Sequence, residues 1–135
     1  MSLTNYAKNK VQDHLFGSVS FTPSGSYYLA LSTTTISSSG SNMTEPAGAV
    51  GYARQPIPND KLTGFSFSSS GCLVNYSTIT YPISTGSWGT ITDVALVDTL
   101  TSGSVWAYTT LTTPKIIQAD TTITFSASAI SISLT

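Results

Sequence analysis

The alternation of apolar and polar residues along this chain predicts a protein built mainly of β-strands. The clearest segment covers residues 81–113, where the alternation begins at Ile91. Residues 94–97 are apolar on both faces, a pattern typical of a strand covered on both sides, although a short apolar run also fits a buried helix segment. Turn-forming residues 99–103 follow, and the alternation resumes at Val105. We therefore expect a central β-hairpin.

Shorter segments with the same two-residue period lie on both sides of this hairpin. Residues 26–32 alternate clearly, and residues 52–55 predict a short strand that Pro56 and Pro58 would stop, which suits the edge of a sheet. The remaining predicted strands are residues 65–67, 73–81, 113–117, 121–125 and 130–134. A total of about eight short strands separated by turn residues is typical of a β-sandwich or a β-barrel.

Only the N-terminal segment has the three- to four-residue period of an α-helix, from residue 3 to residue 16. Its apolar positions are Leu3, Tyr6, Ala7, Val11 and Leu15. Ser2 or Thr4 can cap the start of this helix, and Gly17 can end it. A helix of this length is marginally stable alone, so its apolar side must pack on the sheet or on a neighbouring subunit.

The length of the chain, 135 residues, corresponds to a single domain. We divide it into an N-terminal helical arm, residues 1–17, and a sandwich, residues 18–135. No stretch approaches the ~20 apolar residues of a membrane-spanning helix, and the N-terminal segment lacks the apolar centre of a signal peptide. We therefore expect a soluble, unprocessed protein with no membrane partner.

The surface is expected to be poor in charge and rich in hydroxyl groups. Charged residues make up 8% of the chain, against about 25% in ordinary globular proteins, and Ser and Thr supply about a third of it. The formal net charge is −1 and the basic residues are scattered, which argues against nucleic acid as a partner. With so little net charge the chain lacks self-repulsion, which favours association with other copies.

The residues that enzymes use for catalysis are scarce and scattered. A hydrolytic triad needs a histidine beside a nucleophile and an acid, but His14, the sole histidine, lies on the predicted helix. Asp93 and Asp98 are an odd number of positions apart, so in a regular strand they point to opposite faces. The single cysteine, Cys72, excludes an internal disulfide and a multi-cysteine metal site. We expect no enzymatic activity and no cofactor; a calcium site assembled from several loops stays open.

Glycines, aromatic residues and one long loop add three further expectations. Gly86 and Gly89 flank a tryptophan, which indicates a tight corner before the hairpin rather than a phosphate-binding loop, because no lysine follows.

Four aromatic residues could stack on sugars, although packing in a core or an interface is their more usual role: Tyr27, Tyr28, Trp88 and Trp106. Residues 33–50 form a loop longer than most connections within a domain, which is typical of a functional or mobile segment.

Five stretches of the chain carry a resemblance to a known group of proteins. They are LTNYAKNKVQDHLFG, SYYLALSTT, TEPAGAVGYARQ, TGSWGTITDVALVDT and LTTPKIIQADTTITFSASAISISL. Together they resemble the small β-rich virion proteins of tailed bacteriophages, which are labelled tail-fibre proteins or capsid decoration (cement) proteins. The resemblance implies a jelly-roll-like β-sandwich that is part of the virion and has no enzymatic activity. Residues 35–43 and 59–75 do not match the pattern of this group.

The first hypothesis for the function is a capsid decoration protein. Under it, a homotrimer binds the outer surface of the phage major capsid protein shell and stabilises it through a wet, extensive interface. The alternative is a tail-fibre or receptor-binding module whose loops, residues 33–50 and 59–70, bind a host surface glycan or protein. A carbohydrate-active enzyme is the third hypothesis, and the scattered carboxylates argue against it. Under the first two hypotheses the protein is part of a virion assembled in the host cytoplasm.

Five residues are candidate contacts with a partner chain. Tyr6, Lys10 and His14 lie on the predicted helix, Arg54 lies beside the prolines, and Glu45 lies in the long loop. The alternative is that these side chains are solvated or paired locally, since exposed ion pairs contribute little to stability.

Overall fold

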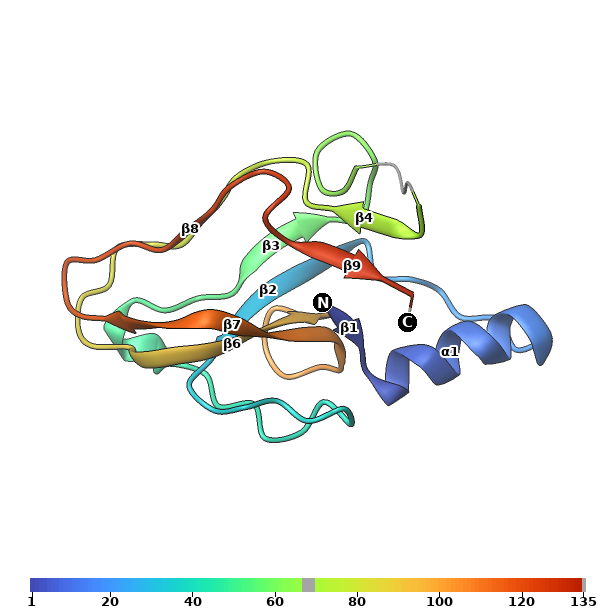
Figure 1. Cartoon of the computed structure of the whole chain (residues 1–135), viewed down its shortest axis with the longest axis horizontal. Helices are drawn as coiled ribbons and strands as arrows, with labels where there is room; N and C mark the ends of the chain where they lie inside the picture. Colours follow the sequence, from blue (N-terminus) through green and yellow to red (C-terminus); the bar gives the residue numbers. More distant parts are fainter. Residues whose placement is uncertain (67–69, 135) are drawn as a thin grey trace.

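The structure is mainly β, with an α-helix that projects from one end of a sheet (Figure 1). It is a computed structural model and describes residues 1–66 and 70–134. Within these residues the α-helix is α1 (Asn5–Phe16), and Gly48–Val50 form a short 3-10 helix, η1. The strands are β1 (Ser2–Leu3), β2 (Ser26–Ser32), β3 (Gln55–Pro58), β4 (Cys72–Val74), β5 (Ile79–Thr80), β6 (Gly89–Val97), β7 (Val105–Ile117), β8 (Thr124–Phe125) and β9 (Ser131–Ser133). The predicted class, mainly β with a short N-terminal helix, is confirmed.

Five antiparallel strands form the main sheet in the order β1-β7-β6-β2-β3. The predicted hairpin lies at its centre, where β6 pairs with β7 on one side and with β2 on the other. Residues 94–97 are buried, in agreement with their apolar pattern. The pairing shifts between Ile91, opposite Lys115, and Asp93, opposite Thr110, so the extra residues of this irregularity lie on β7. Ile91 and Val94 both contribute to the same core cluster.

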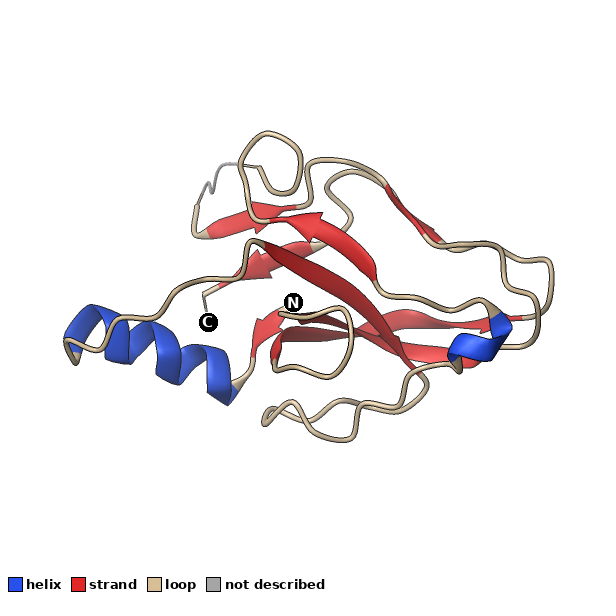
Figure 2. Ribbon diagram, turned by 180° about the vertical axis from the view of Figure 1, so that it is seen from behind, coloured by secondary structure: helices blue, strands red, loops and turns tan. Residues whose placement is uncertain are grey.

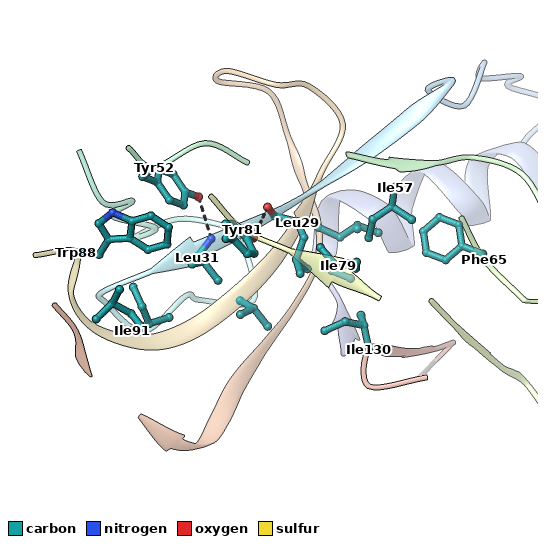
Figure 3. Packing of buried hydrophobic residues seen from close by; sticks show 14 residues of the cluster. Leu29, Leu31, Tyr52, Ile57, Phe65, Ile79, Tyr81, Trp88, Ile91 and Ile130 are labelled. Carbon is teal, nitrogen blue, oxygen red and sulfur yellow. Dashed lines mark hydrogen bonds between the residues drawn. The ribbon is translucent and has the colours of Figure 1, made fainter. Parts of the chain in front are cut away.

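One face of the main sheet packs against a second, smaller layer. This layer consists of two short ladders, in which β4 pairs with β9 and β5 pairs with β8. Leu29 and Leu31 of β2 share a buried cluster with Ile79, Tyr81 and Ile130 of the second layer (Figure 3). The main core therefore lies between two layers, as expected for a sandwich.

The long loop, residues 33–50, covers the opposite face of the sheet. Ile36 of this loop belongs to a second buried cluster with Ala30 and Ala95. The backbone N–H of Ile36 also donates to the buried carboxylate of Asp93, with 3.1 Å between nitrogen and oxygen. These contacts hold part of the loop on the sheet and explain why β6 is buried on both faces.

Two buried tyrosines bind strand β2 through their hydroxyl groups (Figure 3). The hydroxyl of Tyr81 donates to the carbonyl oxygen of Leu29 at 2.6 Å, and the hydroxyl of Tyr52 accepts from the N–H of Leu31 at 3.0 Å. The two rings stack with centroids 6.1 Å apart, and Trp88 lies edge-on to Tyr52 at 5.4 Å. One end of the core is therefore aromatic and hydrogen-bonded.

The glycine-tryptophan corner leads into β6 as predicted. Trp88 is 2% exposed, and its indole N–H donates to the carbonyl oxygen of Val50 at 2.8 Å. Gly89, the first residue of β6, has a φ of +79°, which a residue with a Cβ rarely adopts. A Cβ at Gly86 would lie 2.7 Å from Cγ1 of Val50, so this glycine is required for close packing.

Helix α1 begins later than its period indicated, because Leu3 belongs to a strand. Leu3 lies in β1 and pairs with Ala107 of β7. A strand of two residues has no period, so the pattern could not reveal it. Thr4 caps the helix, as one of the two predicted choices, and Gly17 ends it. The predicted arm, residues 1–17, therefore starts inside the main sheet.

The strand after the long loop contains both prolines that were expected to stop it. β3 begins at Gln55, where the predicted strand ends. Among the described strands it is the edge of the sheet and pairs only with β2. Because Pro56 and Pro58 are two positions apart, both place the missing N–H group on the side that faces no strand. The predicted edge position is confirmed, whereas the predicted bounds are wrong.

The predicted strand at residues 73–81 is interrupted at Asn75, between β4 and β5. The Asn75 side chain is 1% exposed. It donates to the carbonyl oxygens of Ser77 at 2.8 Å and Ser126 at 2.9 Å, and it accepts from the N–H of Ile130 at 2.8 Å. These bonds take the place of a continuous ladder and connect the chain segments of the second layer.

The second layer is smaller than the sequence pattern indicated. Residues 113–117, predicted as a separate strand, form the end of β7, and the predicted strands at residues 121–125 and 130–134 shorten to β8 and β9. The sandwich thus has one five-stranded sheet facing two two-stranded ladders in the described residues. The jelly-roll form of the sandwich stays a prediction.

Two other expectations concern the segment before β4. Phe65 forms an isolated β-bridge with Asn75. Phe67, from the same predicted strand, lies outside the described residues, as do residues 68 and 69 of the predicted functional loop at residues 59–70.

Replacing Asn75 with Ala is predicted to destabilise the second layer. The change removes the bonds to the carbonyls of Ser77 and Ser126 and leaves the buried N–H of Ile130 without its side-chain partner, and such a buried unpaired group costs about 1–3 kcal/mol. We expect the midpoint of thermal unfolding, followed by circular dichroism, to fall by ~5 °C or more. Asn9→Ala, the same change on the exposed face of α1, is the control. An Asn75→Ala protein as stable as this control would contradict the assigned role.

Candidate functional site

Helix α1 is fixed to the sheet through its first turn. The hydroxyl of the fully buried Thr4 donates to the carbonyl oxygen of Val105 at 2.6 Å and accepts from the N–H of Ala7 at 3.2 Å. The backbone N–H of Thr4 donates to the carbonyl oxygen of Trp106 at 2.9 Å. One side chain therefore both caps the helix and binds it to β7. Ala7 is the one residue of α1 that is buried, so the other side chains of the helix are at least partly exposed to solvent.

The helical period gives α1 two flanks on either side of Ala7. Tyr6, Lys10 and His14 are four positions apart and follow one flank, which we call the aromatic flank. Val11 and Leu15 follow the other, which we call the apolar flank. The three helix residues predicted as contacts thus lie together on the aromatic flank.

The aromatic flank forms one wall of a cleft of about 300 Å³, which we call the aromatic cleft. Tyr6 lies edge-on to Trp106 of β7, with ring centroids 5.3 Å apart and planes at 85°. Phe21, from the segment after the helix, lies 5.7 Å from Trp106. The imidazole of His14 is edge-on to Phe21 at 5.3 Å, and Nζ of Lys10 lies 5.7 Å from the ring centroid of Tyr6.

The turn between β6 and β7 provides the polar edge of the cleft, at Asp98 and Thr99. The carboxylate of Asp98 accepts from the backbone N–H of Ser104 at 2.8 Å and from the indole N–H of Trp106 at 3.1 Å. Gly103 has a φ of +84°, and a Cβ at this position would lie 2.4 Å from Oδ1 of Asp98. The tight turn therefore holds the carboxylate in place, and the carboxylate orients the indole ring.

An ion pair on the other side of the same turn holds it to the long loop. The guanidinium of Arg54 donates twice to the carboxylate of Glu45, at 2.9 Å and 2.7 Å. It also donates to the carbonyl oxygens of Thr99 at 2.8 Å and Ser102 at 2.6 Å. The hydroxyl of Tyr52 donates to Glu45 at 2.7 Å. Arg54 is 6% exposed, so this network is largely shielded from water.

These contacts shift the ionisation of all three side chains. Burial alone would raise the pKa of Glu45, but the hydrogen bonds from Arg54 and Tyr52 outweigh it, and the pKa of Glu45 lies below its ordinary value. Burial, and then the bond to Glu45, raise the pKa of Tyr52. The bond to Glu45 raises the pKa of Arg54. The pair is therefore ionised at neutral pH.

The apolar flank borders a groove toward the end of the chain. Leu3, Val11 and Leu134 line it together with the stems of Lys8 and Gln12. Beyond this groove, the end of α1 and the segment that follows it carry exposed apolar side chains: Leu15 (63% exposed), Phe16 (86%) and Val19 (57%). Figure 2 shows that this end of the helix extends past the sheet.

The five candidate contacts predicted from the sequence fall into two separate groups. Tyr6 and Lys10 line the aromatic cleft and His14 packs against Phe21 beside it, whereas Glu45 and Arg54 bind each other. Glu45 and Arg54 are thus paired locally, which was the alternative to contact with a partner chain. Contact of any of the five residues with a partner chain stays a prediction. The sequence singled out Trp106 and Tyr27 as possible stacking residues, and Tyr27 lies edge-on to Trp106 at 5.8 Å. Nothing pointed to Phe21, because residues 18–25 have no period.

Comparison with known protein families matches residues 2–133 to the family described as Podophage GP4 fiber I protein gp80. A comparison with curated proteins finds no match. In the parts of the chain that the structure describes, α1 is too short and too polar to cross a membrane.

The ion pair predicts a pH-dependent contribution of Glu45 to stability. Because the pKa of Glu45 is lower in the folded chain than its ordinary value of 4.5, the ionised carboxylate stabilises the fold above that pH, and this contribution is lost as the pH falls through the folded value. Glu45→Gln should therefore lower the thermal unfolding midpoint most at neutral pH, and the difference from the wild type should shrink near pH 3.

The acid sensitivity of the wild type alone would not test this, because Asp60 contributes to it. Hydrogen bonds from the N–H groups of Thr63 and Leu62 lower the pKa of Asp60 to about 2. The test is therefore the difference between wild type and Glu45→Gln at each pH, with Asp13→Asn on the exposed helix surface as control. A difference that stays constant from pH 7 to pH 3 would rule out the predicted role of Glu45.

Proposed function

Because this chain belongs to the Podophage GP4 fiber I protein gp80 family, we propose that it is a tail-fibre module that assembles with further copies of itself through the apolar flank of α1. Family membership makes the chain a structural component of a bacteriophage particle, of the fibre type. It favours the tail-fibre hypothesis over capsid decoration, which stays an unconfirmed prediction together with the phage major capsid protein as partner. The proposal extends to assembly into the virion in the host cytoplasm.

The observation that carries the proposal is the exposed apolar surface at the end of α1. Leu15 and Phe16 are 63% and 86% exposed, and Val19 follows them at 57%. An isolated helix of this length is marginal in water, and neighbouring exposed apolar side chains typically mark an interface. A partner that covers them would stabilise both the helix and the assembly.

A second copy of this chain is the partner that best fits this surface. The net charge of −1 gives little repulsion between copies. The apolar end of the helix and the groove at Leu3, Val11 and Leu134 lie at different positions on one molecule. If the end of one helix contacts the groove of the next copy, the contact is head-to-tail, and such contacts close into rings when the rotation between copies allows it. A homotrimer is the ring we propose.

The proposed role is binding and assembly without catalysis. His14, the residue best suited to act as a base, packs against Phe21. Asp93 accepts from Ile36 and Thr110, whereas Asp98 accepts from Ser104 and Trp106, so the two carboxylates have separate structural partners. These contacts support a structural role for each residue that the catalytic hypotheses would need.

The oligomeric state tests the assembly. We expect the purified chain to form trimers in analytical ultracentrifugation, and we expect Leu15→Asp to shift it to monomers, because the aspartate would have to be buried in an apolar contact. The thermal unfolding of the monomer should change little, since Leu15 is exposed in the single chain. Leu62→Asp, the same change at an exposed leucine outside the helix, is the matched control. A wild type that stays monomeric, or a Leu15→Asp protein that still forms trimers, would refute the proposed interface.

A further inference from the structure

We propose that the aromatic cleft binds a neutral pyranose sugar, as part of a larger glycan. This inference goes beyond assembly, since the cleft lies on the aromatic flank of α1 and the proposed interface lies on the apolar flank. Trp106, Tyr6 and Phe21 supply its apolar surface, and Asp98, Thr99 and Thr22 supply its polar edge.

The arrangement of the rings suits a sugar rather than a flat or purely apolar ligand. Tyr6 and Trp106 meet at 85°, so they form two walls of a corner instead of one continuous plane. Phe21, tilted by 36° against Trp106, extends the corner. A pyranose has C–H groups on its faces and hydroxyls around its edge. Its C–H groups carry a slight positive charge and pack well on the negative faces of aromatic rings.

The polar edge offers hydrogen-bond groups where the hydroxyls of such a sugar would lie. An ionised carboxylate has about four acceptor positions, and at Asp98 two hydrogen bonds from Ser104 and Trp106 occupy part of them. The remaining positions can accept from sugar hydroxyls. Thr22 and Thr99 are exposed. The hydroxyl of Thr22 can donate or accept, whereas that of Thr99 donates to the carbonyl oxygen of Thr101 at 2.8 Å and can still accept.

The charges around the cleft favour a neutral ligand. Lys10 lies on one wall and Asp98 on the edge, so one positive and one negative side chain line the same cleft. An anionic sugar would be attracted by Lys10 but repelled by Asp98. A cationic sugar would be attracted by Asp98 but repelled by Lys10. A neutral sugar can bond to both groups without either penalty.

The cleft is formed before any ligand binds, which reduces the entropy lost on binding. The hydrogen bond from the Thr4 hydroxyl to the carbonyl oxygen of Val105 fixes Tyr6 beside β7, and the hydrogen bond of the Trp106 indole to Asp98 fixes the Trp106 ring. Arg54 holds the carbonyls of Thr99 and Ser102 in the same turn. Three independent contacts thus maintain a cleft of about 300 Å³, at the lower end of the usual range for ligand pockets and suited to one sugar ring.

Tryptophan fluorescence can test this inference directly. The chain has two tryptophans, and Trp88 is 2% exposed, so a ligand in the cleft would act on the emission of Trp106. The probes are the methyl glycosides of glucose, galactose, mannose, rhamnose and N-acetylglucosamine and their short oligomers, up to tens of millimolar. We expect at least one to shift the emission and to protect it from acrylamide quenching. Trp106→Phe should abolish both signals.

Two variants distinguish binding in the cleft from binding elsewhere, with affinity measured by saturation-transfer NMR. Tyr6→Ala removes one wall and should weaken the binding about tenfold or more. Thr22→Val removes an edge hydroxyl at an exposed position outside the β6–β7 turn, so it should fold normally and still weaken the binding several-fold. Tyr76→Ala, at an exposed tyrosine outside the cleft, should bind as the wild type does.

Failure of the whole panel to bind would overturn the inference, as would unchanged binding by both Tyr6→Ala and Thr22→Val. Leu15→Asp, which should prevent assembly, should keep the affinity of each cleft for its sugar. Loss of assembly with retained binding would leave this inference intact, and loss of binding with retained trimers would leave the proposed assembly intact.

Discussion

One buried threonine determines how the projecting helix is presented. The hydroxyl of Thr4 is bonded on both sides, to the carbonyl of Val105 and to the N–H of Ala7. A helix displaced along β7 would leave this buried hydroxyl or its partners unpaired, at a cost of about 1–3 kcal/mol for each group. Because most of α1 is exposed, its direction depends on these two hydrogen bonds of Thr4 and on the contact of Tyr6 with Trp106. Both the aromatic cleft and the apolar flank follow from it.

The turn between β6 and β7 connects this helix to the long loop. On one side, Asp98 orients Trp106 in the cleft. On the other side, Arg54 holds Thr99 and Ser102 while it pairs with Glu45. Removing one partner of such a shielded pair leaves a charge without compensation, which is far more costly than losing an exposed ion pair. Glu45 and Arg54 therefore act within the chain, as residues that position the edge of the cleft.

Long periodic segments revealed the framework of the fold, and short or aperiodic ones did not. The hairpin and β2 bury regular series of side chains, so their sequences carry the period of their structure. The helical period of residues 3–16 also revealed α1, although Ala7 is its buried residue. β1 has two residues, and β3 tolerates Pro56 and Pro58 because it lies at an edge, so local patterns could not give their bounds. Asn75 interrupts a run that alternates well, because its side chain bonds to segments distant in the sequence. The helix residues of the cleft could be singled out from the sequence, whereas Phe21 and Asp98 join them only through the tertiary structure.

The central claim is that α1 joins this chain to further copies in a tail fibre and leaves the aromatic cleft free. A cryo-electron microscopy map of the virion in which this chain can be located tests it most directly. We expect density in a tail fibre, with Leu15 and Phe16 buried against a second copy and with Tyr6 and Trp106 facing solvent. Density on the capsid shell, or a fibre in which the apolar flank is exposed and the cleft is covered by a neighbouring chain, would contradict it.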